Sequence, residues 1–394
     1  MRILFTITAY PPSTGGAQFH AHETARRLQR NHNVSVMAFW KRNRTDWLLG
    51  TTFRAPSKTE SYIVDGIHVT GLSLKVSQKL SLIPHVLAYY AFKQTAIRGI
   101  SGYLAEQIDA VAGKCDLVHN HRIGREPLSY ASYDTARRKN IPFFLTPYHH
   151  PRWKGWLYRE YHQLYRLSDG VFALTESEKE ILIGLGVAKD RIFVVGGGPV
   201  LAECPRPEIF REQYGLNGRP IVLFVGQKYE YKGLVSLLGA AELTSRKFPD
   251  VVFVFLGPRT DFSRKLFSTV DTRNVLEIGE VDLQVKTDAL AACDIFCLPS
   301  TQESLGMVFL EAWMMEKPVI GGAIPAVSEI ISEGKDGYLV KDDSSQIAER
   351  TIYLLNNPAA RMSLGRKGKE KTLANYSWEK VAEKTEAAYR AIVG

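Results

Sequence analysis

The sequence predicts two α/β domains, each built on a doubly wound parallel β-sheet, with a cleft between them. Short apolar strands alternate with segments of helical periodicity along the chain, the order that helix-covered parallel sheets require. The series of strands restarts after a Gly- and Pro-rich segment at 196–207. Charge and histidines are also divided unequally between the two series. We therefore expect two similar units with different tasks.

Each series is a set of short, largely apolar segments bounded by turn residues. The first series is predicted at residues 2–7, 33–40, 116–121, 142–147, 170–175 and 191–196. The second is predicted at 221–226, 251–257, 274–279, 294–300 and 318–322. This organisation predicts a first domain at 1–198 and a second at 199–376. Residues 377–394 have apolar positions at helical spacing and form a last helix that needs a surface to cover.

Composition places the chain among ordinary soluble globular proteins. It has 394 residues, of which 45% are hydrophobic and 23% charged, which suits about two domains. Its apolar runs are shorter than the roughly 20 residues of a membrane-spanning helix, and we expect no secretion signal. The four cysteines lack a paired metal or redox spacing. They suggest reduced core thiols and a cytoplasmic protein.

The charge is concentrated in the first domain. Residues 1–198 carry 26 Lys and Arg against 15 Asp and Glu, a net charge of +11, whereas the remainder carries 24 against 26, a net charge of −2. All ten histidines also precede residue 198. A basic domain suits nucleic acid, an anionic membrane surface or a phosphorylated substrate. No nucleic-acid reading motif is recognisable, so we expect no nucleic-acid partner.

Residues 301–322, TQESLGMVFLEAWMMEKPVIGG, carry the most informative pattern. A strand ends before this loop, and a helix is predicted to begin near Gly306. Its unpaired amides and dipole suit phosphate oxygens, whereas the carboxylates of Glu303 and Glu311 suit sugar hydroxyls. Together they favour a nucleotide sugar as ligand. The ordinary alternative is that Glu303 caps the helix and Glu311 is a solvated helix residue.

Two further loops have a composition that suits anions. Lys228 and Lys232 follow the strand at 221–226, and Gly233 opens an apolar helix. The spacing is not that of a Walker A motif. Gly15 and Gly16 lie between the first strand and a helix, where backbone without side chains allows close approach of a ligand. Taken singly, the lysines also suit a solvated surface and the glycines an ordinary turn.

Together these loops resemble the retaining nucleotide-sugar glycosyltransferases of family 4. Residues 303–311, ESLGMVFLE, match the E-x7-E motif of that family. The resemblance extends from the amino-terminal GG loop through the lysine loop to GGAIPAVSEII at 321–331 and the closing SWEKV helix. It implies the GT-B architecture of two facing Rossmann-like domains, with the last helix crossing back to the first domain.

The resemblance also implies roles for individual residues. Glu311 is expected to bind the ribose, Glu303 the donor sugar, and Lys232 the diphosphate. Gly15 and Gly16 are expected to close on the donor from the first domain. The backbone amides expected to hold the departing diphosphate belong to Ser304, Leu305, Gly306, Met307 and Val308.

One position departs from the family pattern. The family commonly has Arg after the strand glycine, where this chain has Gln227. An amide donates hydrogen bonds without charge, so stabilisation of the leaving group would depend on Lys232, with Lys228 as a second candidate. The family also often has a His facing the donor, for which His149 and His150 are candidates, His150 being favoured.

These observations predict a retaining glycosyltransferase that uses a nucleoside-diphosphate sugar and a glycan, lipid-linked or small-molecule acceptor. No cofactor or metal is expected, since the chain lacks the D-x-D pattern of the other large glycosyltransferase architecture. The alternatives are a GT-B-like nucleotide-sugar epimerase and a catalytically weakened nucleotide-sugar or polyanion binding protein.

We also expect the enzyme in the cytoplasm, with peripheral binding to an anionic inner membrane face as one option. Residues 75–98 have basic ends and aromatic content. They suit either an amphipathic element on a bilayer or packing onto their own domain, and Pro84 is expected to interrupt them.

Overall fold

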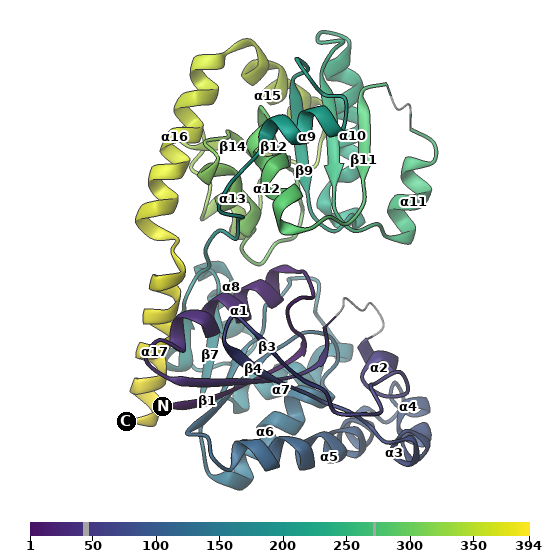
Figure 1. The fold of residues 1–394 in the computed structure, drawn as a ribbon, viewed down its shortest axis with the longest axis vertical. Helices are drawn as coiled ribbons and strands as arrows, with labels where there is room; N and C mark the ends of the chain where they lie inside the picture. The colour runs from purple at the N-terminus through teal and green to yellow at the C-terminus, as the bar shows by residue number, and fades with distance from the viewer. Residues whose placement is uncertain (42–46, 271–272) are drawn as a thin grey trace. The chain divides into compact units, whose positions relative to one another are not determined.

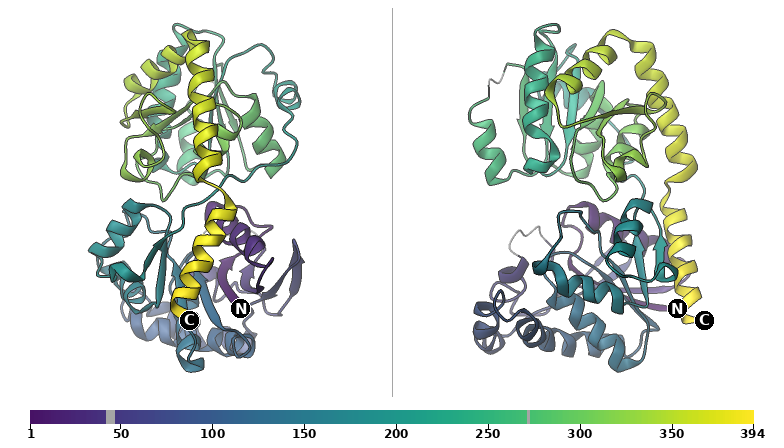
Figure 2. Two further views of the ribbon diagram at one scale, coloured as in Figure 1. Left: turned by 90° about the vertical axis from the view of Figure 1, so that its left-hand side faces the viewer. Right: turned by 180° about the vertical axis from the view of Figure 1, so that it is seen from behind.

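The computed structural model describes residues 1–41, 47–270 and 273–394. It divides into two compact units, shown in Figures 1 and 2. Unit 1 comprises Met1–Gly196 and Trp378–Gly394, and unit 2 comprises Gly197–Ser377. The chain first leaves unit 1 inside the Gly- and Pro-rich segment at 196–207.

Unit 1 is built on an eight-stranded sheet in the order β3-β4-β2-β1-β5-β6-β7-β8. Its strands are β1 (Arg2–Ala9), β2 (Asn33–Trp40), β3 (Ser61–Val64), β4 (Ile67–Gly71), β5 (Leu117–His121), β6 (Phe143–Thr146), β7 (Gly170–Ala173) and β8 (Ile192–Val194). All six strands predicted for this half are present. The residues of β1, β5, β6 and β7 are almost entirely buried, as strands of a parallel sheet covered on both faces should be.

The β3–β4 hairpin is a correction to the all-parallel prediction. β3 pairs with β4 in antiparallel register, and Asp65 and Gly66 join them with φ angles of 47° and 78°. Two successive residues at positive φ make the tight turn whose twist suits a hairpin, and an Asp-Gly pair favours it. The Asp-Gly pair in the sequence therefore indicated this hairpin, although the strand prediction did not include it.

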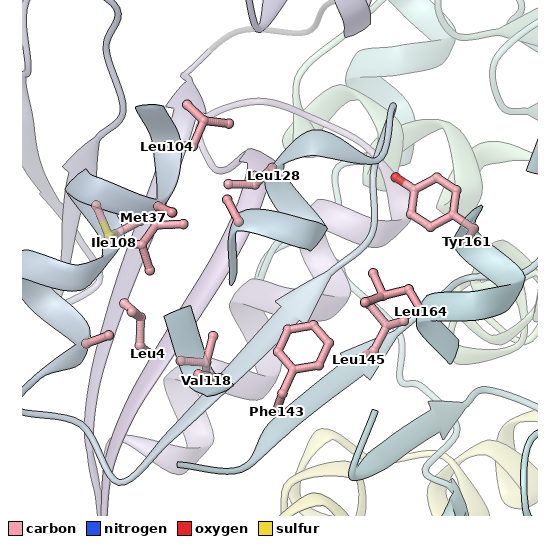
Figure 3. Close-up of a cluster of buried hydrophobic side chains, with 14 of the residues drawn as sticks. Leu4, Met37, Leu104, Ile108, Val118, Leu128, Phe143, Leu145, Tyr161 and Leu164 are labelled. Atoms are coloured by element: carbon pink, nitrogen blue, oxygen red, sulfur yellow. The ribbon is translucent and has the colours of Figure 1, made fainter. Parts of the chain in front are cut away.

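One face of the unit 1 sheet packs on helices to form a large apolar core (Figure 3). Leu4, Val118 and Phe143 on the strands belong to the same buried cluster as Leu104 and Ile108 of α5. The helical segments of unit 1 are α1 (Gly16–Leu28), α2 (Trp47–Gly50), α3 (Val76–Ser81), α4 (Ile83–Leu87), α5 (Lys93–Ala112), α6 (Pro127–Lys139), η1 (Trp156–Tyr158), α7 (Arg159–Leu167), α8 (Glu176–Gly184), η2 (Lys189–Arg191) and α17 (Trp378–Val393).

The opposite face of that sheet carries buried histidines beneath α17, which packs beside α1 (Figure 2). His119 of β5 contacts Tyr389 of α17, with 2.6 Å between Nδ1 and the phenol oxygen. Its Nε2 lies 2.7 Å from the Thr146 hydroxyl. His121 stacks near it, with ring centroids 4.1 Å apart. The last helix is thus joined to unit 1 by polar contacts inside the core.

Unit 2 is built on a six-stranded parallel sheet in the order β11-β10-β9-β12-β13-β14. Its strands are β9 (Ile221–Val225), β10 (Val252–Leu256), β11 (Val275–Ile278), β12 (Ile295–Leu298), β13 (Val319–Gly322) and β14 (Gly337–Val340). The five predicted strands are present, and β14 was not predicted. Its helical segments are α9 (Pro207–Gln213), η3 (Glu230–Lys232), α10 (Leu234–Ser245), α11 (Asp261–Phe267), α12 (Leu283–Ala292), α13 (Met307–Met314), α14 (Pro325–Ser328), α15 (Ser344–Asn356) and α16 (Pro358–Asn375).

The cysteines are free thiols, as predicted, but they are not all in the core. Cys293 and Cys297 are buried, Cys115 is half-buried and Cys204 is exposed. None of the described helices combines the length and the apolar character that crossing a bilayer requires.

The buried histidines make the stability of unit 1 sensitive to acid. Burial lowers the pKa of His20 to about 4, and burial also depresses the pKa values of His119 and His121. Their neutral forms are therefore favoured in the folded state. The stability they contribute is present above the unfolded-state pKa of about 6.5 and is lost as pH falls from there toward 4.

We expect His20 alone to account for roughly 2 kcal/mol of unfolding free energy lost between pH 7.5 and pH 5. Denaturant titrations at both values, on the wild type and on His20→Gln, measure the difference. The variant should lose less stability over this interval, whereas the exposed control His68→Gln should behave like the wild type. Equal losses in all three proteins would contradict the assignment.

Candidate nucleotide-sugar site

The candidate site in unit 2 is formed where two neighbouring strands, β9 and β12, end. The loop after β9 and the loop after β12 are joined by a hydrogen bond of 2.9 Å from the Thr301 amide to the Tyr231 carbonyl. Gly233 has a φ of 74°, and a Cβ there would lie 2.4 Å from the Pro299 carbonyl oxygen. Only glycine permits this approach. The carboxyl ends of parallel strands are also where open α/β sheets bind ligands.

The joined loops bring Lys232 onto Glu303. The ammonium nitrogen of Lys232 lies 2.6 Å from Glu303 Oε1, and both side chains are largely buried. An ammonium has three N–H groups, so this bond leaves it donors for another anion. The pair therefore combines a held carboxylate with a cation suited to phosphate.

Helix α13 begins at Met307 with Gly306 as its N-cap, as predicted, and Gly306 has a φ of 80°. No side chain caps this helix, so Glu303 does not play the capping role that was the ordinary alternative. Leu305 is buried, while Ser304, Met307 and Val308 are half-buried. The first amides of an α-helix have no intrahelical acceptor. This end of α13 therefore presents N–H donors beside Lys232 and Glu303.

Glu311, one helical turn into α13, is buried and not solvated. Lys286 of α12 contacts its Oε2 at 2.8 Å, and the Val200 amide donates to its Oε1 at 3.3 Å. Lys286 also donates to the Val200 carbonyl at 2.9 Å. The three groups form a closed ring that fixes the carboxylate. Lys286 was missed because it occupies an ordinary helical position with no motif around it.

The structure excludes Lys228 as a phosphate ligand, which corrects the second candidate in that loop. Lys228 is fully buried. Its ammonium donates to the carbonyls of Gly257 at 2.8 Å and Ile278 at 2.6 Å, and it pairs with Glu277. These three bonds use all of its N–H groups. Gln227, the residue before it, is exposed and brings no charge to the loop.

In unit 1, Gly15 and Gly16 lie at the start of α1. Gly15 is the N-cap, with a φ of 152°, and a Cβ at this position would lie 2.4 Å from Gln18 Oε1. Helix α1 begins at Gly16, without an N-cap side-chain hydrogen bond. The turn into the helix thus favours glycine at position 15, where φ is positive.

The two candidate histidines follow β6 and differ in environment. His149 is buried, and burial lowers its pKa to about 3, with the nearby Arg122 charge adding to the effect. Its amide donates to Glu178 at 2.6 Å, and burial raises the pKa of this glutamate to about 7. His150 is half-buried and lies edge-on to Trp153, with ring centroids 5.0 Å apart. His150 is therefore the more accessible of the two.

Arg122 is a further buried cation in this region that the sequence analysis did not single out. Its guanidinium lies between the rings of Trp153 and Tyr161, 3.6 Å and 3.9 Å from their centroids. Cation–π contact of this kind stabilises a desolvated guanidinium. Arg122 directly follows the buried strand β5, and no sequence motif at this position indicated a functional residue. Arg122 fixes the loop that carries His149 and His150 by holding Trp153.

Among residues 1–41, 47–270 and 273–394, no group of three or more His, Cys, Asp and Glu side chains is arranged to hold a metal ion.

Comparison with known proteins assigns both halves of the chain to glycosyltransferase families. Residues 206–371 match the model "Glycosyl transferases group 1", and residues 15–198 match "Glycosyl transferase 4-like domain". Spore coat protein SA of Bacillus subtilis is 32% identical over 194 residues, 46% of this chain and 52% of that protein. Alpha-maltose-1-phosphate synthase of Mycolicibacterium smegmatis is 25% identical over 379 residues, 84% of this chain and 96% of that protein.

This chain spans about half the length of Spore coat protein SA and of the next curated relative that it matches. Among solved structures, Anabaena HepE in complex with UDP-glucose superposes with a TM-score of 0.78 at 15% sequence identity, covering 99% of this chain and 100% of that one. This likeness shows the fold, and the family models cover both units. The chain belongs to the group 1 glycosyltransferases of GT-B fold.

Proposed function

We propose that the protein is a retaining glycosyltransferase that moves a sugar from a nucleoside diphosphate to an acceptor. The observation that carries this proposal is the arrangement around α13. Two held carboxylates, Glu303 and Glu311, flank the start of α13, whose first amides have no intrahelical acceptor, and Lys232 adds a cation beside it. Carboxylates accept hydrogen bonds from sugar hydroxyls, whereas amides and an ammonium favour phosphate oxygens.

In the proposed complex the three parts of the donor bind to three parts of this arrangement. Glu311 accepts hydrogen bonds from the ribose, and Lys286 is a positioning residue that keeps its carboxylate in place. Glu303 holds hydroxyls of the transferred sugar. The amides of residues 304–308 and Lys232 hold the diphosphate. Pairing with lysine also limits the repulsion that bare carboxylates would exert on a diphosphate.

The transfer step breaks the bond between the anomeric carbon and the diphosphate oxygen. The acceptor oxygen forms its bond to the same face of that carbon, and the departing diphosphate takes the acceptor proton. Negative charge grows on the leaving phosphate, where fixed donors stabilise it most effectively. Lys232 and the start of α13 supply this stabilisation, so we propose chemistry without a metal.

The acceptor in this proposal is a glycan, a lipid-linked sugar or a small molecule, and the protein acts in the cytoplasm or on an anionic membrane face. A nucleotide-sugar donor is supported by HepE, whose structure contains UDP-glucose. A role in glycoside synthesis is supported by the name of the alpha-maltose-1-phosphate synthase relative. The family resemblance assigns Gly15, Gly16 and one of His149 and His150, of which we favour His150, to the donor side of the reaction.

Gln227 is the observation that favours a second candidate, a nucleotide-sugar binding protein with weakened catalysis. Its exposed amide replaces the arginine that the family commonly has. Tight donor binding without turnover would support this candidate, and turnover of donor without any acceptor would support an epimerase.

Donor binding is the first expectation. A series of UDP-, GDP- and ADP-sugars should contain one nucleotide class that raises the unfolding midpoint, because a ligand at 100 times its Kd stabilises by about 2.7 kcal/mol. Glu311→Gln should lose most of this shift in differential scanning fluorimetry. Glu316→Gln, an exposed residue that pairs with Lys369 beyond the end of α13, is the control and should keep it. A shift that survives in Glu311→Gln would remove the ribose assignment.

The two lysines of the β9 loop should have opposite effects. Lys232→Met should weaken donor binding about 10- to 100-fold, since a charge-assisted hydrogen bond contributes roughly 1.5–3 kcal/mol. Lys228→Met should instead lower the unfolding free energy by about 3 kcal/mol, since Glu277 and two carbonyls lose their partner. Calorimetric titration with the donor and urea unfolding separate these effects. The control Lys335→Met, at an exposed lysine, should change neither donor affinity nor unfolding free energy. Weak donor binding by a folded Lys228→Met variant would contradict the purely structural role of Lys228.

Metal independence is tested once turnover has been observed. We expect transfer to continue in excess EDTA, because Lys232 and helix amides supply the charge that a metal would otherwise bring. Nucleotide release in the presence of acceptor measures the rate. Loss of turnover that added Mg²⁺ restores would show that this part of the proposal is wrong.

A further inference from the structure

Unit 1 exposes a concentration of large apolar side chains at one edge. Six of them lie on α3, α4 and the approach to α5, which Figure 1 shows next to one another: Val76, Leu80, Ile83, Leu87, Tyr90 and Phe92. Trp156 and Leu157 of η1 adjoin them, since Lys93 at the start of α5 donates to the Leu157 carbonyl. We call these eight residues the apolar edge. They are half of the sixteen exposed large apolar residues in the described part of the chain.

The apolar edge belongs to a segment that is held firmly in the fold. Leu82 and Tyr89 of the same segment are fully buried, and Pro84 opens α4 where an interruption was expected. Lys93 is buried against Glu126 at 2.8 Å and Glu160 at 3.5 Å. One face of the segment therefore packs on unit 1, as one of the two alternatives predicted. The other face keeps Leu87 at 79% exposure and Phe92 at 68%.

The charged side chains around the apolar edge are mostly basic, although exposed Glu106 of α5 lies one helical turn beyond Tyr103, which contacts Ser81 of α3. Residues 66–105 and 135–159 contain no Asp or Glu. Arg125 donates to the Tyr90 hydroxyl at 3.2 Å, and the Arg159 guanidinium lies 4.5 Å from the centre of the Trp156 ring. Lys75 and Lys79 flank Val76, and Arg152 and Lys154 precede η1. Glu126 and Glu160, which directly follow Arg125 and Arg159, are buried against Lys93, and Glu160 also pairs with Arg159.

We propose that the apolar edge binds the surface of an anionic phospholipid bilayer. Leu, Phe and Trp side chains enter the boundary between headgroups and acyl chains, while Lys and Arg remain with the phosphates. Each basic residue near an anionic leaflet adds to the attraction. A symmetric pair of copies through this edge is disfavoured, since it would place two sets of cations against each other. The reason for such binding rests on the proposed function, because a lipid-linked acceptor of the transferase would reside at a membrane surface.

Vesicle sedimentation tests the proposal without donor or acceptor. The wild type should pellet with vesicles of equal phosphatidylglycerol and phosphatidylcholine and remain in solution with phosphatidylcholine alone. The double variant Leu87→Ser with Phe92→Ser should bind the anionic vesicles at least tenfold more weakly. A second double variant, Lys75→Gln with Lys79→Gln, should bind more weakly and lose much of its salt dependence.

The matched control is Met362→Ser with Leu373→Ser on α16 of unit 2, whose side chains are similarly exposed at 68% and 61%. This control should bind vesicles like the wild type, and an unchanged unfolding midpoint in each variant shows that it is folded. Absence of wild-type binding to anionic vesicles, or equal binding by all variants, would overturn the proposal. So would a dimer in solution that only the Leu87 and Phe92 variant disrupts. Donor-induced stabilisation of the same proteins reports separately on the proposed function.

Discussion

The neutralisation of two enclosed carboxylates is the constraint on which the candidate site depends. Glu303 and Glu311 lie in or beside the same short helix, and neither could be withdrawn from water alone at acceptable cost. Lys232 and Lys286 approach them from two different elements, η3 and α12. Each pairing therefore requires the loop after β9, the helix before β12 and the start of α13 to be assembled together. The charged groups of the site therefore reach their positions only when these elements of unit 2 are packed together.

Close backbone approaches make that assembly possible. Gly233 allows the β9 loop to lie against Pro299, and Gly322 at the end of β13 lies against the Ser300 carbonyl, where a Cβ would be 2.0 Å from the oxygen. Gly306 supplies the left-handed residue from which α13 begins. These glycines allow close backbone packing. At the start of α13, the absence of a side chain also leaves the helix amides accessible to a ligand.

Unit 1 uses buried polar groups differently. Its histidines and the Arg122 guanidinium are enclosed by aromatic rings, and Glu178 holds the backbone of the loop that carries His149 and His150. These groups fix the position of loops and of α17, at the cost of sensitivity to acid.

The apolar edge of unit 1 exposes apolar side chains to water although the helices beneath them are well packed. A surface of this kind indicates a partner rather than poor folding.

Local patterns in the sequence determined the eleven predicted strands, the start of α13 at Gly306 and the E-x7-E spacing of Glu303 and Glu311, because strand periodicity and turn chemistry act over a few residues. The same local signals left Lys228 as a second candidate beside Lys232. Tertiary structure decided between them, since Glu277 and two carbonyls enclose the first while Glu303 meets the second. It also supplied Lys286 and Arg122 and showed which face of residues 75–98 is buried. Partners and burial depend on residues distant in the sequence, so no short stretch could specify them.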